Sequence, residues 1–155
     1  MKDKFPIKIH RHKQGQEVKF IAMTSLEKAI KTPQAIEHQL GFVELDYTLT
    51  LKTAQAALNA AKQKSRVDVR AFWLLGNTLL EFLQRLEEMG FYLVNPYATF
   101  ARDLRLGASS LEKILAFRKR FPNILSIDPS IPWNKYRDNK VLFSSVRNPR
   151  LRSNP

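Results

Sequence analysis

The residues best suited to a chemical task lie between residues 97 and 121, in YATFARDLRLGASSLEKILAFRKRF. Small and apolar side chains recur there at the spacing of a helix-turn-helix, in which one helix packs across a second helix that enters the major groove of DNA. The predicted buried set is Ala101, Leu104, Leu106, Leu111 and Ile114. Side chains left exposed on the second helix suit base edges, because glutamate accepts from cytosine, lysine donates to guanine and serine does either. They are Ala108, Ser109, Glu112, Lys113, Ala116 and Lys119.

The turn between these two predicted helices departs from the usual pattern. Arg105 stands where such motifs usually have a glycine, and Gly107 follows two residues later. This spacing predicts a turn shifted toward Gly107, and with it a looser or non-specific fit to a groove. Any tight helical hairpin with an alanine at its crossing gives a similar pattern, so two ordinary core helices are the alternative. The basic end of the second helix, RKR, favours nucleic-acid contact.

Basic residues around this segment are candidates for phosphate contacts. The chain has 26 Lys and Arg against 14 Asp and Glu, a net charge of +12, which favours a polyanionic partner. The excess lies at the two ends: residues 1–65 carry +5, residues 66–110 carry 0 and residues 111–155 carry +7. The predicted nucleic-acid-binding set is Arg102, Arg105, Ser109, Ser110, Glu112, Lys113, Arg118, Lys119, Arg120, Lys135, Arg137, Arg147, Arg150 and Arg152. Lys13 and Lys19 are further phosphate candidates.

Other groupings in the sequence predict no catalytic, metal or cofactor site. His10 and His12 share a face of a predicted strand, with His38 as a distant third candidate, and two histidines without a clear third ligand do not define a metal site. Glu44 and Asp46 share a face of FVELDY, residues 42–47, which we interpret as an extended segment. The five glycines are not clustered, which excludes a P-loop and a dinucleotide fingerprint. We therefore expect a protein that is not an enzyme, with no cofactor and no metal.

The elements that must position these residues predict a mainly α fold, a helical bundle of five or six helices with a small N-terminal β-hairpin. The hairpin covers residues 7–23, with Gly15 at its turn. Short helices are predicted at 24–32, opened by a capping box of Thr24 and Glu27, and at 33–40, ended by Gly41. Longer helices follow at 48–64, at 65–90 as the central core helix, at 96–106 and at 109–121, the last capped by Ser109 or Ser110. We expect one domain over residues 1–140 and a basic flexible tail over residues 141–155.

A last short helix is predicted in SIPWNKYRDN, residues 130–139. Trp133 and Tyr136 lie there between basic residues, so stacking on unpaired bases is one interpretation. Folding of Trp133 back on the core is the favoured one, because a proline-led helix with one large aromatic residue commonly caps a bundle.

The order of three segments resembles the N-terminal helical domain of YhcG-like nucleases. The segments are FWLLGNTLLEFLQRL, ATFARDLRLGASSLEKILAFRKRFP and IPWNKYRD, between Phe72 and Arg137, and they cover under half of the chain. The resemblance implies a helix-turn-helix-type nucleic-acid-binding module, in a family whose nuclease lies in a separate C-terminal domain. Its matching positions, mostly core or turn residues, are Trp73, Gly76, Ala101, Leu104, Ser110, Phe117, Phe121, Pro122, Trp133 and Tyr136. In this chain we find no acidic pair followed by a Glu-x-Lys element on strands, the pattern of that nuclease half.

These observations predict a non-catalytic protein that binds double-stranded DNA, in transcriptional regulation or in DNA handling on a mobile element. Two alternatives remain open: an RNA-binding subunit or a helical subunit of an RNA-guided complex, and an antitoxin or inhibitor whose hairpin adds a strand to a protein partner. The chain has no cysteine, no apolar run of a signal peptide and no membrane-spanning run, so we expect a cytoplasmic protein without membrane contact. The sequence shows no surplus apolar face and leaves the oligomeric state open.

Overall fold

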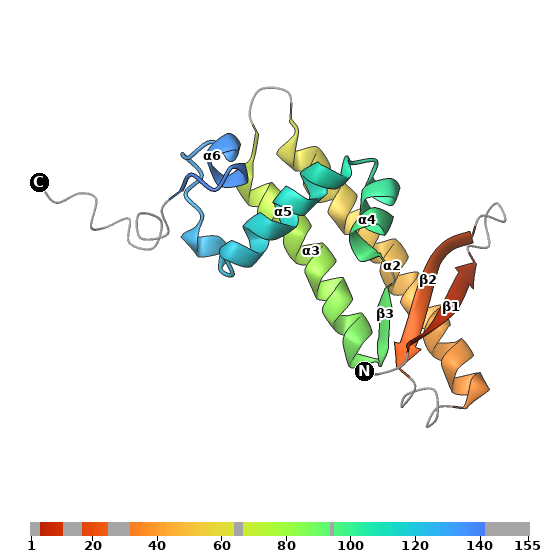
Figure 1. The fold of residues 1–155 in the computed structure, drawn as a ribbon. Coiled ribbons are helices and arrows are strands. Elements are labelled where there is room, and N and C mark those ends of the chain that lie inside the picture. Colours follow the sequence, from red (N-terminus) through yellow and green to blue (C-terminus); the bar gives the residue numbers. More distant parts are fainter. Residues whose placement is uncertain (1–3, 11–16, 25–31, 64–66, 94, 142–155) are drawn as a thin grey trace, which may run out of the picture.

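The computed structural model describes residues 4–10, 17–24, 32–63, 67–93 and 95–141 (Figure 1). This part of the chain is mainly helical, in agreement with the predicted fold class. Its strands are β1 (Lys4–His10), β2 (Glu17–Thr24) and β3 (Phe91–Leu93). Its helices are α2 (Pro33–Ala61), α3 (Val69–Glu88), α4 (Pro96–Leu104), α5 (Ala108–Arg120) and α6 (Trp133–Arg137), with a 3-10 turn η1 (Ile124–Ser126).

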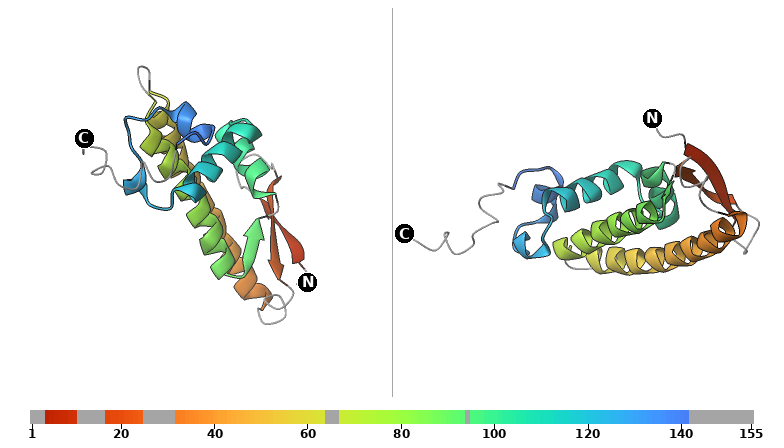
Figure 2. Two further views of the ribbon diagram at one scale, coloured as in Figure 1. Left: turned by 60° about the vertical axis from the view of Figure 1, so that its left-hand side comes forward. Right: turned by 90° about the horizontal axis from the view of Figure 1, so that it is seen from below.

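The helices form three layers, with α3 in the middle. Helices α2 and α3 run antiparallel side by side, and α5 crosses α3 on the face that α2 does not cover (Figures 1 and 2). The sheet lies at one end of this stack and α6 at the other (Figure 1). The buried side chains of all three layers join into one core, to which α3 contributes Val69, Ala71, Phe72, Trp73, Leu75, Gly76, Leu79, Phe82 and Leu86. The prediction of a central core helix near residues 66–89 is therefore confirmed.

Helix α2 corrects the prediction for residues 33–64. We expected two helices separated by an extended segment at 42–47, whereas one helix of 29 residues runs through from Pro33 to Ala61. Its buried face repeats every three or four residues, at Val43, Tyr47, Thr50, Ala54, Leu58 and Ala61. Gly41 is exposed within this helix and does not end it. The predicted face shared by Glu44 and Asp46 on a strand therefore does not exist, because residues two apart on a helix point in different directions.

The start of α2 is fixed by Thr32 and Pro33. The Thr32 hydroxyl accepts a hydrogen bond from the backbone N–H of Ala35 at 3.1 Å, and the proline occupies the first turn, where its missing N–H has no partner to lose. Residues 25–31, on which most of the predicted helix at 24–32 falls, lie outside the described residues, and β2 extends through Thr24.

The N-terminal strands pair antiparallel, with Ile7 opposite Ile21, and a register shift falls between Ile9 and His10. Strand β3 pairs antiparallel with β2, with Ile21 opposite Leu93, to give the order β1-β2-β3. Strand β3 was not predicted, because three residues are too few to show an alternating pattern in the sequence. Phe91 and Leu93 of β3 are buried in the core, so β3 joins the sheet to the helical layers. In the part of the chain that the structure describes, no helix has the length and apolar character that a membrane span requires.

Candidate nucleic-acid interface

Helices α4 and α5 form the pair that the sequence predicts. Ala101 is buried where the two helices meet, and the predicted anchors Leu104, Leu111 and Ile114 are at most 2% exposed. Leu106 is half-buried against the same core. The pair therefore has the packed inner side that a helix-turn-helix requires.

The turn between α4 and α5 places its left-handed residue at Arg105. Arg105 has φ 54° and ψ 44°, while Gly107 has φ −65° and begins α5 as its extended N-cap. The N–H of Leu106 donates to the carbonyl of Ala101 at 2.9 Å, and the N–H of Arg105 donates to that of Arg102 at 3.3 Å, which together form a Schellman end. The predicted shift of the turn toward Gly107 is thus wrong. The prediction that Ser109 or Ser110 caps the helix is wrong too, because Gly107 takes that position.

The outer face of α5 is open to solvent along its whole length. All of the predicted exposed positions are exposed: Ala108, Ser109, Glu112, Lys113, Ala116 and Lys119, together with Ser110. No described side chain caps the first turn of the helix, so the N–H groups of its first residues point toward solvent. This face therefore combines small residues, charged residues and a helix N-terminus, all of which suit a phosphate backbone or base edges.

The inner face of α5 is held against α3 by Arg118, which we had predicted to contact phosphates. The Arg118 guanidinium lies 4.8 Å from the centre of the Trp73 ring, and its Nε donates to Asn77 Oδ1 at 2.9 Å. Gly76 allows this approach, because a Cβ there would lie 2.9 Å from the Arg118 Cβ. Trp73 Nε1 donates at 2.6 Å to the carbonyl of Phe121, the C-cap of α5. Arg118 is thus engaged in holding the two helices together.

Arg120 is engaged in a similar way at the C-terminal end of α5. Its Nη2 donates to the carbonyl of Tyr136 in α6 at 2.7 Å, and its Nε is buried without a hydrogen-bond partner among the described residues. Burial lowers the pKa of the Arg120 guanidinium from its ordinary value. Like Arg118, Arg120 therefore belongs to the contacts that orient α5.

Two further basic residues of the pair are exposed but tethered. The Lys119 ammonium donates to the Tyr97 hydroxyl at 2.7 Å and lies 5.5 Å from the centre of that ring, which links α5 to α4. Arg102 Nε lies 3.2 Å from Asp103, whose other carboxylate oxygen accepts from the Tyr47 hydroxyl at 2.6 Å. The guanidinium of Arg105 makes no hydrogen bond or ion pair with the residues that the structure describes, so its charge is available at the turn.

Helix α6 adds exposed basic residues beside the far end of α5. Trp133 stacks on Phe72 with ring centres 4.4 Å apart, and Tyr136 is fully buried, so the prediction that Trp133 folds back on the core is confirmed. Lys135 and Arg137 are exposed. The hydrogen bond from Arg137 lowers the pKa of the Asp138 carboxyl, and the charges of Lys140 and Lys113 lower it further.

Several predicted candidates fall where the structure says nothing of their side chains. His12, Lys13, Arg147, Arg150 and Arg152 lie outside the described residues, and only the backbone of β1 with His10 and of β2 with Lys19 is described. His38 is exposed on α2, with its ring 4.9 Å from that of Phe42. Within the described ranges, no three potential ligands gather into a group that would hold a metal ion.

Comparison of the chain with models of known protein families, with curated proteins and with solved structures finds no match. The resemblance to YhcG-like nucleases therefore stays a prediction. Two of its matching residues nevertheless have a structural explanation here, because Trp73 and Gly76 of α3 both contact the C-terminal half of α5 or its C-cap. The role of Asn77 in this docking and that of Tyr97 in linking α4 to α5 were not predicted from the sequence. For Asn77 the available signal was that Gly76 and Asn77 follow Trp73 by three and four residues on one helix.

Proposed function

We propose that this protein binds double-stranded DNA without catalysis, with the outer face of α5 directed to a groove. The observation that supports this most is the division of α5 into two faces. The inner face is fixed to α3, α4 and α6, whereas the outer positions from Ala108 to Lys119 are all exposed. A rigidly held helix with a free outer face is what reading of base edges requires, because a mobile helix would lose its register on the duplex.

The charges available for phosphates differ from those that the sequence suggested. Arg118 and Arg120 are engaged inside the fold, so the contribution of the pair comes from Arg105, Lys113 and Lys119. The uncapped N-terminus of α5 adds backbone N–H donors for one phosphate. Lys135 is a further exposed cation, on α6, whose Tyr136 carbonyl accepts from Arg120 near the C-terminal end of α5. Because few fixed cations are available, the salt dependence of binding should be correspondingly small. A plot of the logarithm of the association constant against the logarithm of the salt concentration should have a slope of about −0.9 for each phosphate contacted.

The test compares fluorescence anisotropy of the full chain with duplex DNA, single-stranded DNA and structured RNA over a range of salt concentrations. We expect the tightest binding to duplex DNA. RNA binding tighter than that to any duplex would replace this proposal with the RNA alternative. An absence of nucleic-acid affinity even at low salt would favour the protein-interaction alternative.

Base reading is tested by Lys113→Ala in a selection from randomised duplexes. If α5 reads bases, this substitution relaxes preference at one base position by roughly 1–3 kcal/mol. The matched control is Lys62→Ala, which removes an exposed lysine from the end of α2, on the other side of α3 from α5 (Figure 2). Equal weakening of all sequences by Lys113→Ala would mean that α5 contacts only phosphates.

A further inference from the structure

Tyr97 of α4 and Lys119 of α5 form a contact whose donors and acceptors can be counted. The Lys119 ammonium donates to the Tyr97 hydroxyl oxygen at 2.7 Å. An ammonium group has three protons and no acceptor, so it cannot take the hydroxyl proton in return. Among the described residues, none accepts that proton, and none accepts the other protons of Lys119. This part of the chain therefore sets O–H and N–H donors side by side and supplies no acceptor for them.

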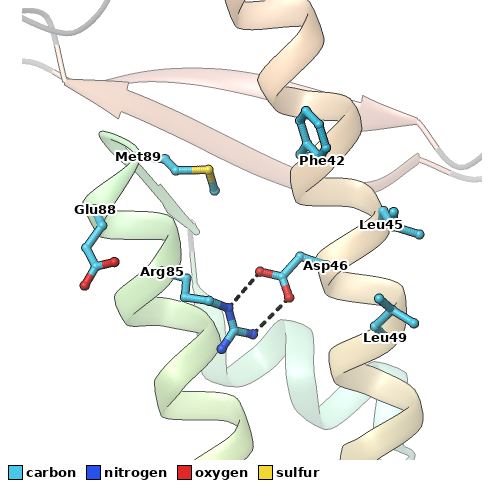
Figure 3. A pocket seen from close by; sticks show the side chains of 7 residues that line it. All are labelled: Phe42, Leu45, Asp46, Leu49, Arg85, Glu88 and Met89. Carbon is cyan, nitrogen blue, oxygen red and sulfur yellow. Dashed lines mark hydrogen bonds and ion pairs between the residues drawn. The ribbon is translucent and has the colours of Figure 1, made fainter.

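The Lys119 contact differs from the ion pair that joins α2 to α3. There the Arg85 guanidinium donates two hydrogen bonds of 2.9 Å to the Asp46 carboxylate, as Figure 3 shows, so the two charges offset each other. The acceptor in the Lys119 contact is a hydroxyl, which leaves the charge of the exposed lysine uncompensated. Donation by a cation also polarises the hydroxyl and strengthens its own donation to a further acceptor.

The position of this contact matches a phosphate at the edge of a DNA groove. Lys119 follows Ala116 by three residues and Glu112 by seven, which places all three along one side of α5. A rise of about 1.5 Å per residue separates Lys119 from Ala108, at the start of α5, by about 16–17 Å. The major groove of DNA is about 12 Å wide, so the two ends of the helix can reach phosphates on opposite sides of one groove.

We propose that the Tyr97 hydroxyl and the Lys119 ammonium together bind one phosphate of the DNA backbone. The hydroxyl donates to an oxygen of this phosphate, and the charge of Lys119 offsets the negative charge of the phosphate. Because a hydroxyl that accepts from a cation directs its own proton away from it, Lys119 also orients Tyr97. This inference rests on the proposed function and adds to it a ligand from α4, so that one phosphate contacts both helices of the pair.

The first test measures the affinity of the full chain for a duplex selected for tight binding, over a range of salt concentrations. Lys119→Gln removes the charge, so the association constant should fall and its logarithmic salt slope should become less negative by about 0.9. Tyr97→Phe removes only the hydroxyl, so the association constant should fall about two- to tenfold with the slope unchanged. Lys62→Gln, at the exposed C-cap of α2, is the matched control and should change neither quantity. Circular dichroism verifies that the three variants are folded.

The second test identifies the phosphate by ethylation interference, in which an ethyl group neutralises one phosphate of the duplex at a time. One phosphate whose ethylation weakens binding of the unmodified chain should lose this effect in Lys119→Gln and show a smaller effect in Tyr97→Phe. Arg105→Ala should leave the effect of that phosphate unchanged, because Arg105 precedes the other end of α5.

Two outcomes would overturn the proposal and leave the proposed function intact. One is duplex binding by Tyr97→Phe that is as tight as that of the unmodified chain. The other is an interference pattern in which the Tyr97 and Lys119 variants lose different phosphates or none. If the unmodified chain binds no duplex at any salt concentration, the proposed function is wrong and this proposal with it.

Discussion

Replacing Arg105 by glycine should make the protein more stable while weakening DNA binding. Arg105 has φ 54° and ψ 44° at the end of α4, a left-handed conformation that costs an L-residue roughly 1–2 kcal/mol. Glycine removes this cost but loses more conformational entropy on folding, roughly 0.5–1 kcal/mol. The net gain in the free energy of unfolding is then about 0.5–1 kcal/mol, which for a chain of this size raises Tm by ~1–4 °C.

Two control variants separate backbone strain from charge. Arg105→Ala removes the guanidinium but keeps a Cβ in the left-handed region, so it should not raise stability. Gly107→Ala should be tolerated, because Gly107 has φ −65° and an added Cβ would lie 3.8 Å from the nearest atom, Ser110 Oγ. Urea and thermal unfolding followed by circular dichroism measure these differences. Anisotropy with duplex DNA should show equal losses for both Arg105 variants, because each removes the same positive charge.

The results that would refute this reasoning are specific. If Gly107→Ala destabilises strongly and Arg105→Gly does not change stability, the left-handed residue is at 107, in line with a turn shifted toward Gly107. If Arg105→Ala stabilises as much as Arg105→Gly, relief of charge repulsion explains the gain and backbone strain does not.

Two further predictions concern the packing of α3 and the charges of α6. Gly76→Ala should lower the free energy of unfolding in urea by about 1–2 kcal/mol, since crowding against the Arg118 Cβ at 2.9 Å outweighs the gain in helix propensity. The same change at Gly41, where no atom lies within 4 Å, should stabilise α2 by about 1 kcal/mol; a loss there would contradict the explanation. An NMR titration should give Asp138 a pKa below its ordinary value, because Arg137 donates to the ionised carboxylate, and Arg137→Gln should raise it. Since folding lowers this pKa, the pair stabilises the fold above the unfolded-state pKa, and that contribution disappears as the pH falls through the folded-state pKa.

The helices from residue 69 onward could be predicted because their local signals agree. The apolar positions of α3 repeat at helical spacing, Pro96 opens α4, and α5 ends just before Pro122. Pro96 and Pro122 restrict the backbone at these two boundaries, which therefore depend little on tertiary context. The exposed positions of α5 followed from the same periodicity.

The first half of α2 could not be predicted in the same way. Val43, Leu45 and Tyr47 alternate with polar residues as in a strand, while Val43, Tyr47 and Thr50 fit a helix equally well. Packing against α3 decides between the two periods, because only the helix buries Val43 and Tyr47 together with Ala54. The error also concealed the exposure of Leu45, since in a strand Leu45 would have shared a face with Val43 and Tyr47, which are buried.

The basic residues of α5 show why counting positive charges in a sequence overestimates the number that a surface can offer to a ligand. Arg118 and Arg120 were predicted to contact phosphates, but their partners Asn77 and Tyr136 lie 41 and 16 residues away in sequence. Only the fold brings such groups together, so no local pattern shows which cations are already engaged.

The engaged cations determine how any DNA complex would be organised. Trp73, Gly76 and Arg118 fix the angle at which α5 crosses α3, so their substitution should alter the geometry of the outer face without removing any group from it. The outer face of α5 itself carries Glu112 beside Lys113 and Lys119, a small net charge. In the proposed complex, affinity from phosphates would come mainly from Arg105 before α5, Lys119 near its end and Lys135 of α6, all of which are exposed. Such an arrangement would separate the two tasks, with phosphate contacts at the ends setting position and the middle of α5 left to discriminate between bases.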